Sequence, residues 1–127
     1  MLIGGYAVNF HGYVRTTGDF DVWIATSPSN ARKIVDALIH FGFDPDDVDE
    51  SLFTQPRQIV RMGQEPLRIE LVTMIDGVTW EQCWGRAVHT VIDGVEARFI
   101  SLADLRRNKA ASGRDKDLLD LNRLPKA

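Results

Sequence analysis

Apolar residues recur at helical spacing in several segments of the chain. The clearest is residues 31–41, where apolar side chains three and four positions apart follow the helix-start residues 27–29 and precede Gly42. A second helix is predicted from Ser101, which opens a capping-box-like segment, to a stop at Gly113. Shorter helices are predicted over residues 4–11, 79–87 and 114–124.

Other segments alternate apolar and polar residues, which is the period of a half-buried strand. Residues 19–24 alternate in this way, and Asp93-Gly94 is a strong hairpin signal between the strand-like residues 88–92 and 95–100. Further strands are predicted at residues 58–62 and 67–73, around a turn at 63–66. Because helices and strands interleave, we predict an α/β (α+β) fold with a mixed β-sheet flanked by helices.

The length of the chain predicts one domain over residues 1–127. Its composition, 44% hydrophobic and 26% charged, is that of an ordinary globular protein and excludes collagenous and disordered classes. No apolar run approaches the roughly 20 residues needed to span a bilayer. No secretory leader is recognisable, and Cys83 has no second cysteine to pair with. We therefore expect a cytoplasmic protein that does not associate with membranes.

Charge is distributed unevenly along the chain. Residues 1–105 carry 8 Lys/Arg against 15 Asp/Glu, whereas residues 106–127 carry 7 Lys/Arg against 3 Asp, and the whole chain has a net charge of −3. This balance excludes a broad nucleic-acid-binding surface. It suits a site where carboxylates hold cations and a few basic side chains meet phosphates, although a solvated basic helix would give the same pattern.

The strand at residues 19–24 carries the first candidate chemistry. Asp19 and Asp21 are two positions apart, so on a strand their side chains share a face, with Cα atoms roughly 6.6 Å apart. Paired carboxylates of this kind hold Mg²⁺, and two ions roughly 4 Å apart support phosphoryl-type transfer. The alternative is a strand with one solvated face.

Two neighbouring features bear on the same site. Gly4 and Gly5 stand at the start of a predicted helix, where backbone N–H groups can approach an anion, although a diglycine is often only a turn. Glu70 lies between two apolar residues in a second predicted strand. Beside the first strand it would supply a third oxygen ligand or a general base, and the alternative is a salt bridge with Arg68 or Arg98.

These motifs resemble the DNA-polymerase-β-type nucleotidyltransferase superfamily. Ile3-Gly4-Gly5, a spacer of thirteen residues and Asp19-Phe20-Asp21-Val22 resemble its glycine and paired-aspartate motif, and Ile69-Glu70-Leu71 is similar to its third acidic motif. The rest of the chain, including Lys109, Arg114 and Lys116-Asp117, looks like small bacterial nucleotidyltransferases. These are near the minimal nucleotidyltransferases and the toxins of abortive-infection type toxin–antitoxin systems.

The resemblance implies an enzyme that moves a nucleoside monophosphate from an NTP to an acceptor and releases pyrophosphate. Asp19, Asp21 and Glu70 would be the catalytic carboxylates and would bind Mg²⁺, with two ions expected. The nucleotide would be bound by Gly4, Gly5, Arg15, Lys109 and Arg114. For the three basic residues, surface charge or, at Arg15, an ordinary loop is the alternative, with Asp117 pairing Lys109 or Arg114.

The acceptor and the partners stay open at this point. RNA, a protein hydroxyl and a small hydroxylated molecule are the candidate acceptors. The family's glycine motif follows a complete strand, whereas only residues 1–3 precede Gly4, so the N-terminal strand looks truncated and the exposed sheet edge makes a homodimer plausible. The alternative function is a non-catalytic nucleotide-binding or regulatory module. Both the enzyme and the non-catalytic module are compatible with a role as one half of a toxin–antitoxin pair.

Overall fold

The computed structural model describes residues 1–64, 66 and 68–127. The helices and strands fall where the hydrophobic pattern predicts them, within a few residues at each end. The turn predicted at 63–66 lies partly outside the described residues. In chain order the elements are α1 (Gly4–Phe10), β1 (Asp19–Trp23), α2 (Pro28–Phe41), the 3₁₀ helices η1 (Pro45–Asp47) and η2 (Glu50–Phe53), β2 (Ile59–Met62), β3 (Arg68–Val72), α3 (Trp80–Arg86), β4 (Val88–Ile92), β5 (Val95–Phe99), α4 (Leu102–Ser112) and α5 (Asp115–Arg123).

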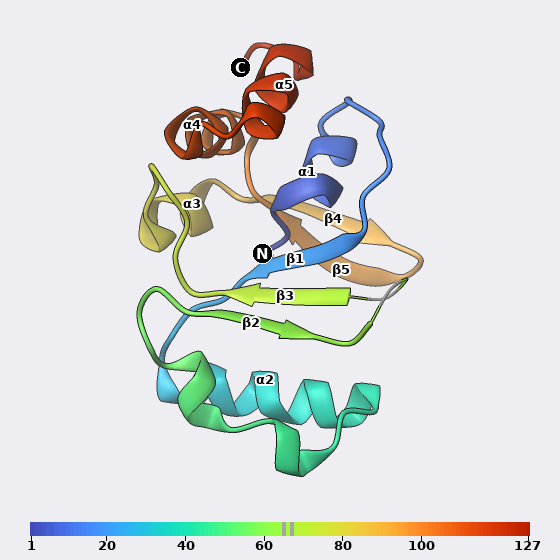
Figure 1. Cartoon of the computed structure of the whole chain (residues 1–127), viewed down its shortest axis with the longest axis vertical. Helices are drawn as coiled ribbons and strands as arrows, with labels where there is room; N and C mark the ends of the chain where they lie inside the picture. The colour runs from blue at the N-terminus through green and yellow to red at the C-terminus, as the bar shows by residue number, and fades with distance from the viewer. Residues whose placement is uncertain (65, 67) are drawn as a thin grey trace.

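The strands form a mixed sheet, as predicted. In its first part β3 lies in the centre, parallel to β1 and antiparallel to β2 (Figure 1). β4 and β5 form an antiparallel hairpin around the predicted turn. Leu2 joins the two parts, because it bridges Val22 on one side and Phe99 on the other. A single bridge residue therefore stands where the family pattern places an N-terminal strand.

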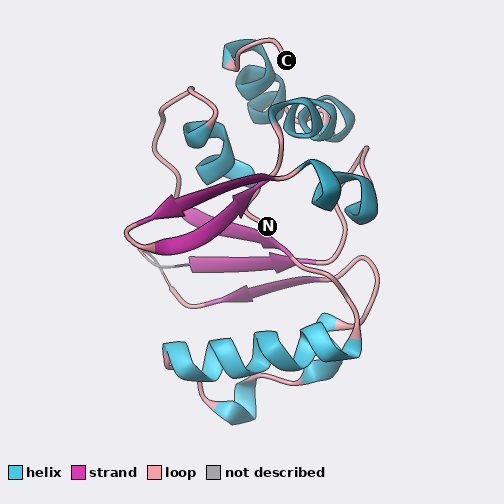
Figure 2. Ribbon diagram, turned by 180° about the vertical axis from the view of Figure 1, so that it is seen from behind, coloured by secondary structure: helices cyan, strands magenta, loops and turns pink. Residues whose placement is uncertain are grey.

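Two hydrophobic clusters lie on opposite faces of the strands β1–β3. α2 and the two 3₁₀ helices cover one face, whereas α1, α4 and α5 lie on the other side (Figures 1 and 2). The α2 cluster is built around Ala31, Leu38, Phe53 and Leu71. The second cluster includes Val8, Trp23, Cys83, Phe99, Ile100 and Leu105. The alternation along the strands thus leaves one face of β1 and β3 free to carry polar side chains toward α1 and α5.

The turn between α4 and α5 matters most for the site. Ser101 caps α4, because its hydroxyl accepts a hydrogen bond of 3.1 Å from the Asp104 N–H. Gly113 ends α4 in the left-handed conformation, with φ of 65°, which a side chain would disfavour. The chain therefore reverses at Gly113, and Lys109 in α4 meets Asp117 in α5.

None of the helices within the described residues combines the length and the apolar character that a membrane crossing requires.

Candidate active site

Three carboxylates converge on the face of β1 and β3 that points away from α2. The parallel register places Asp21 opposite Glu70, and Asp19 precedes Asp21 on the same face. One oxygen from each of Asp19, Asp21 and Glu70 lies within 4.8 Å of the others. The structure thus brings together the three acids that the sequence singled out, and oxygen donors at this spacing can share a hard cation.

Two arginines contact the outer members of this carboxylate cluster. Arg68 Nε donates to Asp19 Oδ1 at 2.7 Å, and Arg61 Nε donates to Glu70 Oε1 at 2.5 Å. The salt-bridge alternative for Glu70 named Arg68 or Arg98, but the observed partner is Arg61, which lies opposite Glu70 in the β2–β3 register. The Arg61 side chain is 64% exposed, so its pair with Glu70 is weak and can be exchanged for a ligand, whereas the Arg68 side chain is 40% exposed and is only partly open to solvent.

Asp21 is the innermost member of the cluster. Its Oδ1 is buried and has no hydrogen-bond partner among the described residues. Burial, followed by a hydrogen bond with Glu70 and the negative charges of Glu70 and Asp19, raises the pKa of Asp21 to about 7, while Lys116 acts in the opposite direction. An unpartnered buried carboxylate oxygen beside two like charges is what a bound cation would satisfy.

The diglycine turn lies directly against this cluster. Gly4 has φ of +62°, and a Cβ there would lie 2.1 Å from Asp21 Oδ2. A Cβ on Gly5 would lie 2.3 Å from Thr17 Oγ1. The two glycines therefore let α1 approach the carboxylates and the segment that leads into β1. Their contact with a triphosphate remains a prediction.

A cleft of about 670 Å³ runs past the carboxylates toward the turn between α4 and α5. All eight residues that the sequence proposed for the site line this one cleft. They are Gly4, Gly5, Arg15, Asp19, Asp21, Glu70, Lys109 and Arg114. Residues up to 110 positions apart are thus assembled on one surface of ligand-binding size.

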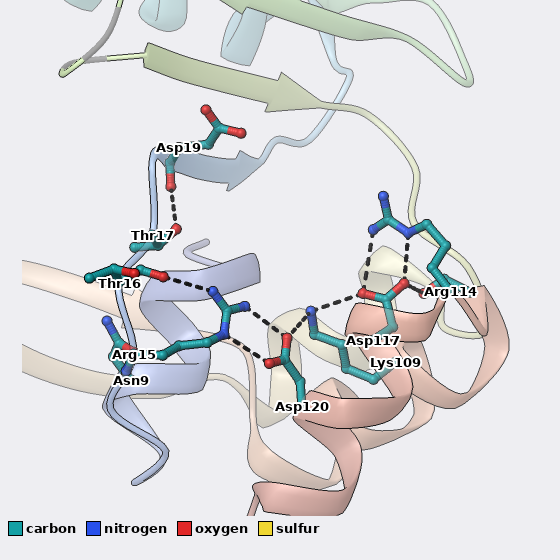
Figure 3. Close-up of polar contacts among 10 residues, drawn as sticks. Asn9, Arg15, Thr16, Thr17, Asp19, Lys109, Arg114, Asp117 and Asp120 are labelled. Atoms are coloured by element: carbon teal, nitrogen blue, oxygen red, sulfur yellow. Dashed lines mark hydrogen bonds and ion pairs between the residues drawn. The ribbon is translucent and has the colours of Figure 1, made fainter.

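A chain of alternating charges lies across the cleft from Asp19, and all of its members except Asp120 line the cleft (Figure 3). Lys109, only 5% exposed, contacts Asp117 Oδ1 at 3.2 Å and Asp120 Oδ2 at 3.0 Å. Arg114 Nε donates to Asp117 Oδ2 at 2.7 Å. At the other end of the chain of charges, Arg15 donates two hydrogen bonds to Asp120. The pairing of Lys109 and Arg114 by Asp117, which the sequence left as an alternative, is therefore present.

Asp117 and Asp120, the two aspartates of this chain of charges, are ionised. Burial alone would raise their pKa values, but hydrogen bonds from arginine and lysine more than offset burial and lower the pKa of both Asp117 and Asp120. The ammonium group of Lys109 therefore already contacts two ionised aspartates of the protein. Its contact with phosphate stays a prediction. Arg114 differs, because 66% of its side chain surface is exposed and it remains accessible to a ligand in the cleft.

Comparison with known protein families finds a match over the whole chain. A family model described as "Nucleotidyl transferase of unknown function (DUF2204)" matches residues 1–127. The chain belongs to this nucleotidyltransferase family. The membership confirms the resemblance and the mixed α/β fold predicted from the motifs, and at a coarse level it supports a transferase. No curated protein matches the chain.

Sequence reasoning missed other residues that lie in or beside the cleft. Arg57, Arg61 and Lys116 add positive charge near the carboxylates. Asp120 closes the chain of charges, and the sequence analysis assigns it no role. One signal could have found it, because Asp117 and Asp120 are three residues apart and so share a helix face. No local signal pairs Arg61 with Glu70, since that contact depends on the register of β2 and β3.

Proposed function

We propose that the chain is a Mg²⁺-dependent nucleotidyltransferase that transfers a nucleoside monophosphate from an NTP to a hydroxyl-bearing acceptor and releases pyrophosphate. One observation carries the proposal: three carboxylates converge within 4.8 Å on the face of a cleft that the diglycine turn also lines. Membership in a nucleotidyltransferase family supports the class of reaction.

The residues present fit the implied metal. Three carboxylates form the hard oxygen donor set that Mg²⁺ prefers, and the buried Oδ1 of Asp21 lacks a hydrogen-bond partner among the described residues. Asp19, Asp21 and Glu70 would hold the ion, and two ions are expected. When bound, the metal would neutralise charge on the triphosphate and favour attack by the acceptor oxygen.

The remaining groups would bind and orient the substrates. A bond forms between the acceptor oxygen and the α-phosphorus, the bond from that phosphorus to the bridging oxygen breaks, and pyrophosphate leaves with that oxygen. Glu70 would take the proton of the acceptor hydroxyl, because it belongs to the carboxylate cluster at which the substrates would meet. Arg114 would meet the phosphates as charge develops on them, and Gly4 and Gly5 would admit the triphosphate close to the backbone.

Transfer can be tested with labelled nucleotides. The protein is incubated with Mg²⁺, a cell extract and each of the four NTPs, labelled in parallel at the α or the γ phosphate. We expect label from the α phosphate alone to appear in an acceptor, which separates nucleotidyl from phosphoryl transfer. Fractionation into RNA, protein and small molecules then identifies the acceptor class.

Asp21→Asn is the decisive variant for this assay. Loss of the innermost carboxylate should reduce label transfer by about a hundredfold or more, the upper range for losing a group that orients a metal. Asp36→Asn, which removes an exposed carboxylate from α2, is the matched control and should transfer label normally. Equal labelling by wild type and Asp21→Asn would refute the assigned metal site.

The same assay separates the alternative module and the partner proposals. Metal-dependent NTP binding in calorimetry, with no label in any fraction, would indicate a nucleotide-binding or regulatory module instead. The contacts of Arg61 and Arg68 with two of the three carboxylates are the observation on its side. Label in one co-purified protein would identify it as an acceptor and as the candidate cognate partner of a toxin–antitoxin pair. A homodimer through the sheet edge is tested by measuring mass in solution.

A further inference from the structure

Asp120 is a buried carboxylate with no role in the chemistry proposed above. Its side chain is 3% exposed, and it receives two parallel hydrogen bonds from Arg15: Nε donates to Oδ1 and Nη2 donates to Oδ2, both at 2.8 Å. Lys109 Nζ adds a third contact at 3.0 Å. A two-pronged arginine–carboxylate pair restricts orientation as well as distance, so Asp120 determines where the Arg15 guanidinium lies.

Arg15 belongs to the segment that connects α1 to β1. This connection, residues 11–18, contains no helix or strand. The backbone N–H of Arg15 donates to Asn9 Oδ1 of α1 at 2.9 Å, and Nη1 donates to the Thr16 carbonyl at 3.1 Å. Arg15 thus ties the connection to α1 by its backbone and to α5 by its side chain (Figure 3).

The residues after Arg15 lead directly into the site. The Thr17 hydroxyl donates to the Asp19 carbonyl at 3.3 Å, and Thr17 packs against Gly5 so closely that a Cβ there would overlap it. Asp19 is the first residue of β1 and one of the three clustered carboxylates. A connection without regular structure has few internal contacts to hold it, so its anchor at Arg15 controls how well Asp19 is placed.

We propose that the Arg15–Asp120 pair is a positioning clamp for the candidate active site. The clamp holds residues 15–18 against α1 and thereby keeps the Asp19 carboxylate beside Asp21 and Glu70. Three of the five guanidinium N–H groups of Arg15 already contact the protein, which accounts for its place at the cleft without a phosphate contact. The inference rests on the proposed function for its purpose, since it assigns a role within the same site.

A matched control exists elsewhere in the fold. Arg86 holds the buried Asp104 with two hydrogen bonds of the same kind, at 3.0 and 2.8 Å, and neither residue lines the cleft. Arg15→Lys and Arg86→Lys each retain the positive charge and lose the fork. Both variants should unfold at a lower temperature than wild type, so thermal stability alone does not distinguish a clamp from ordinary support.

Two other measurements do distinguish them. The first is the affinity for Mn²⁺, which binds carboxylate oxygens as Mg²⁺ does and is observed by electron paramagnetic resonance. We expect Arg15→Lys to weaken Mn²⁺ binding by about tenfold, the lower range for residues that orient metal ligands, and Arg86→Lys to leave it unchanged. The second is hydrogen exchange, in which Arg15→Lys should speed exchange of the amides at residues 16–19 and Arg86→Lys should not.

Asp120→Asn provides the reciprocal test and should match Arg15→Lys in both measurements. The double variant, with Arg15→Lys and Asp120→Asn together, should bind Mn²⁺ no more weakly than either single variant, because both changes break the same pair. Wild-type Mn²⁺ affinity and exchange in a folded Arg15→Lys would overturn the clamp, as would equal effects in Arg86→Lys. Neither measurement requires turnover, so a wild-type protein that binds Mn²⁺ and transfers no label would refute the proposed function and leave the clamp standing.

Discussion

The molecule holds two groups of acidic side chains that differ in how far basic neighbours balance their charges. Asp19, Asp21 and Glu70 crowd together on the sheet, and one oxygen of Asp21 is buried without a hydrogen-bond partner among the described residues. Asp104, Asp117 and Asp120 are more deeply buried, yet each contacts at least two basic side chains. Those contacts are with Arg86, Arg107, Arg114, Lys109 and Arg15.

The difference shows in the direction of the pKa shifts. The pKa of Asp21 is raised to about 7, mainly by burial, whereas arginine and lysine partners overcome burial and lower the pKa of Asp104, Asp117 and Asp120. A paired carboxylate helps to hold the helices together, and a crowded carboxylate stores repulsion that a cation would relieve. Burial alone therefore does not separate a structural acid from a functional one, but the charge of its neighbours does.

The largest expected contrast is in stability. Asp104→Asn removes charge-assisted hydrogen bonds to Arg86 and Arg107 and should lower the free energy of unfolding by about 2 kcal/mol. Asp21→Asn should not lower the free energy of unfolding at pH 8 without metal, because it removes a charge that repels Asp19 and Glu70. Urea unfolding in the presence of a chelator measures both. Equal destabilisation by the two variants would contradict the division into structural and functional acids.

The two groups also predict opposite pH dependences. Because the folded-state pKa of Asp21 is raised, the stability linked to it is present at acid pH and is lost as pH rises toward about 7. The three paired aspartates have lowered pKa values, so their contribution is present above the unfolded value of about 3.9 and is lost as pH falls below it.

Metal affinity should follow the Asp21 titration. A proton held with a pKa of about 7 competes with a cation at pH 6 but not at pH 8. Mg²⁺ or Mn²⁺ should therefore bind about tenfold more weakly at pH 6 than at pH 8, and calorimetry at the two values measures the difference. Asp21→Asn should bind poorly at both. Identical wild-type affinities would show that no proton with a pKa near 7 competes with the cation at this site.

The smallest expected effect sharpens the role of the diglycine turn. Gly4→Ala places a Cβ 2.1 Å from Asp21 Oδ2 at φ of +62°, whereas Gly94→Ala, at φ of +79°, meets nothing within 4 Å. Both should lose about 1 kcal/mol of stability to backbone strain. Only Gly4→Ala should also weaken Mn²⁺ binding, because the Asp21 carboxylate must move. A Gly94→Ala variant with equally weakened binding would remove the link between the turn and the metal site.

Much of the site could be predicted because its motifs are local. Asp19 and Asp21 share a face on any strand, and the glycines stand where a helix must begin. The partners of these groups could not be predicted in the same way. Arg61 meets Glu70 only because β2 pairs with β3 in one register, and Arg15 meets Asp120 across 105 residues of chain. Long-range pairs of this kind depend on how whole elements pack.

The sequence by itself determined the order and type of the elements, the mixed sheet and the identity of the candidate carboxylates, since apolar periodicity and short motifs act over a few residues. The tertiary structure alone decided which charges neutralise each other. In the folded chain Lys109 is buried between two aspartates, whereas Asp21 lies beside two other acids. Both arrangements depend on how α4, α5 and the sheet pack together. Electrostatic interactions depend on distance in space, and distance along the chain does not reveal it.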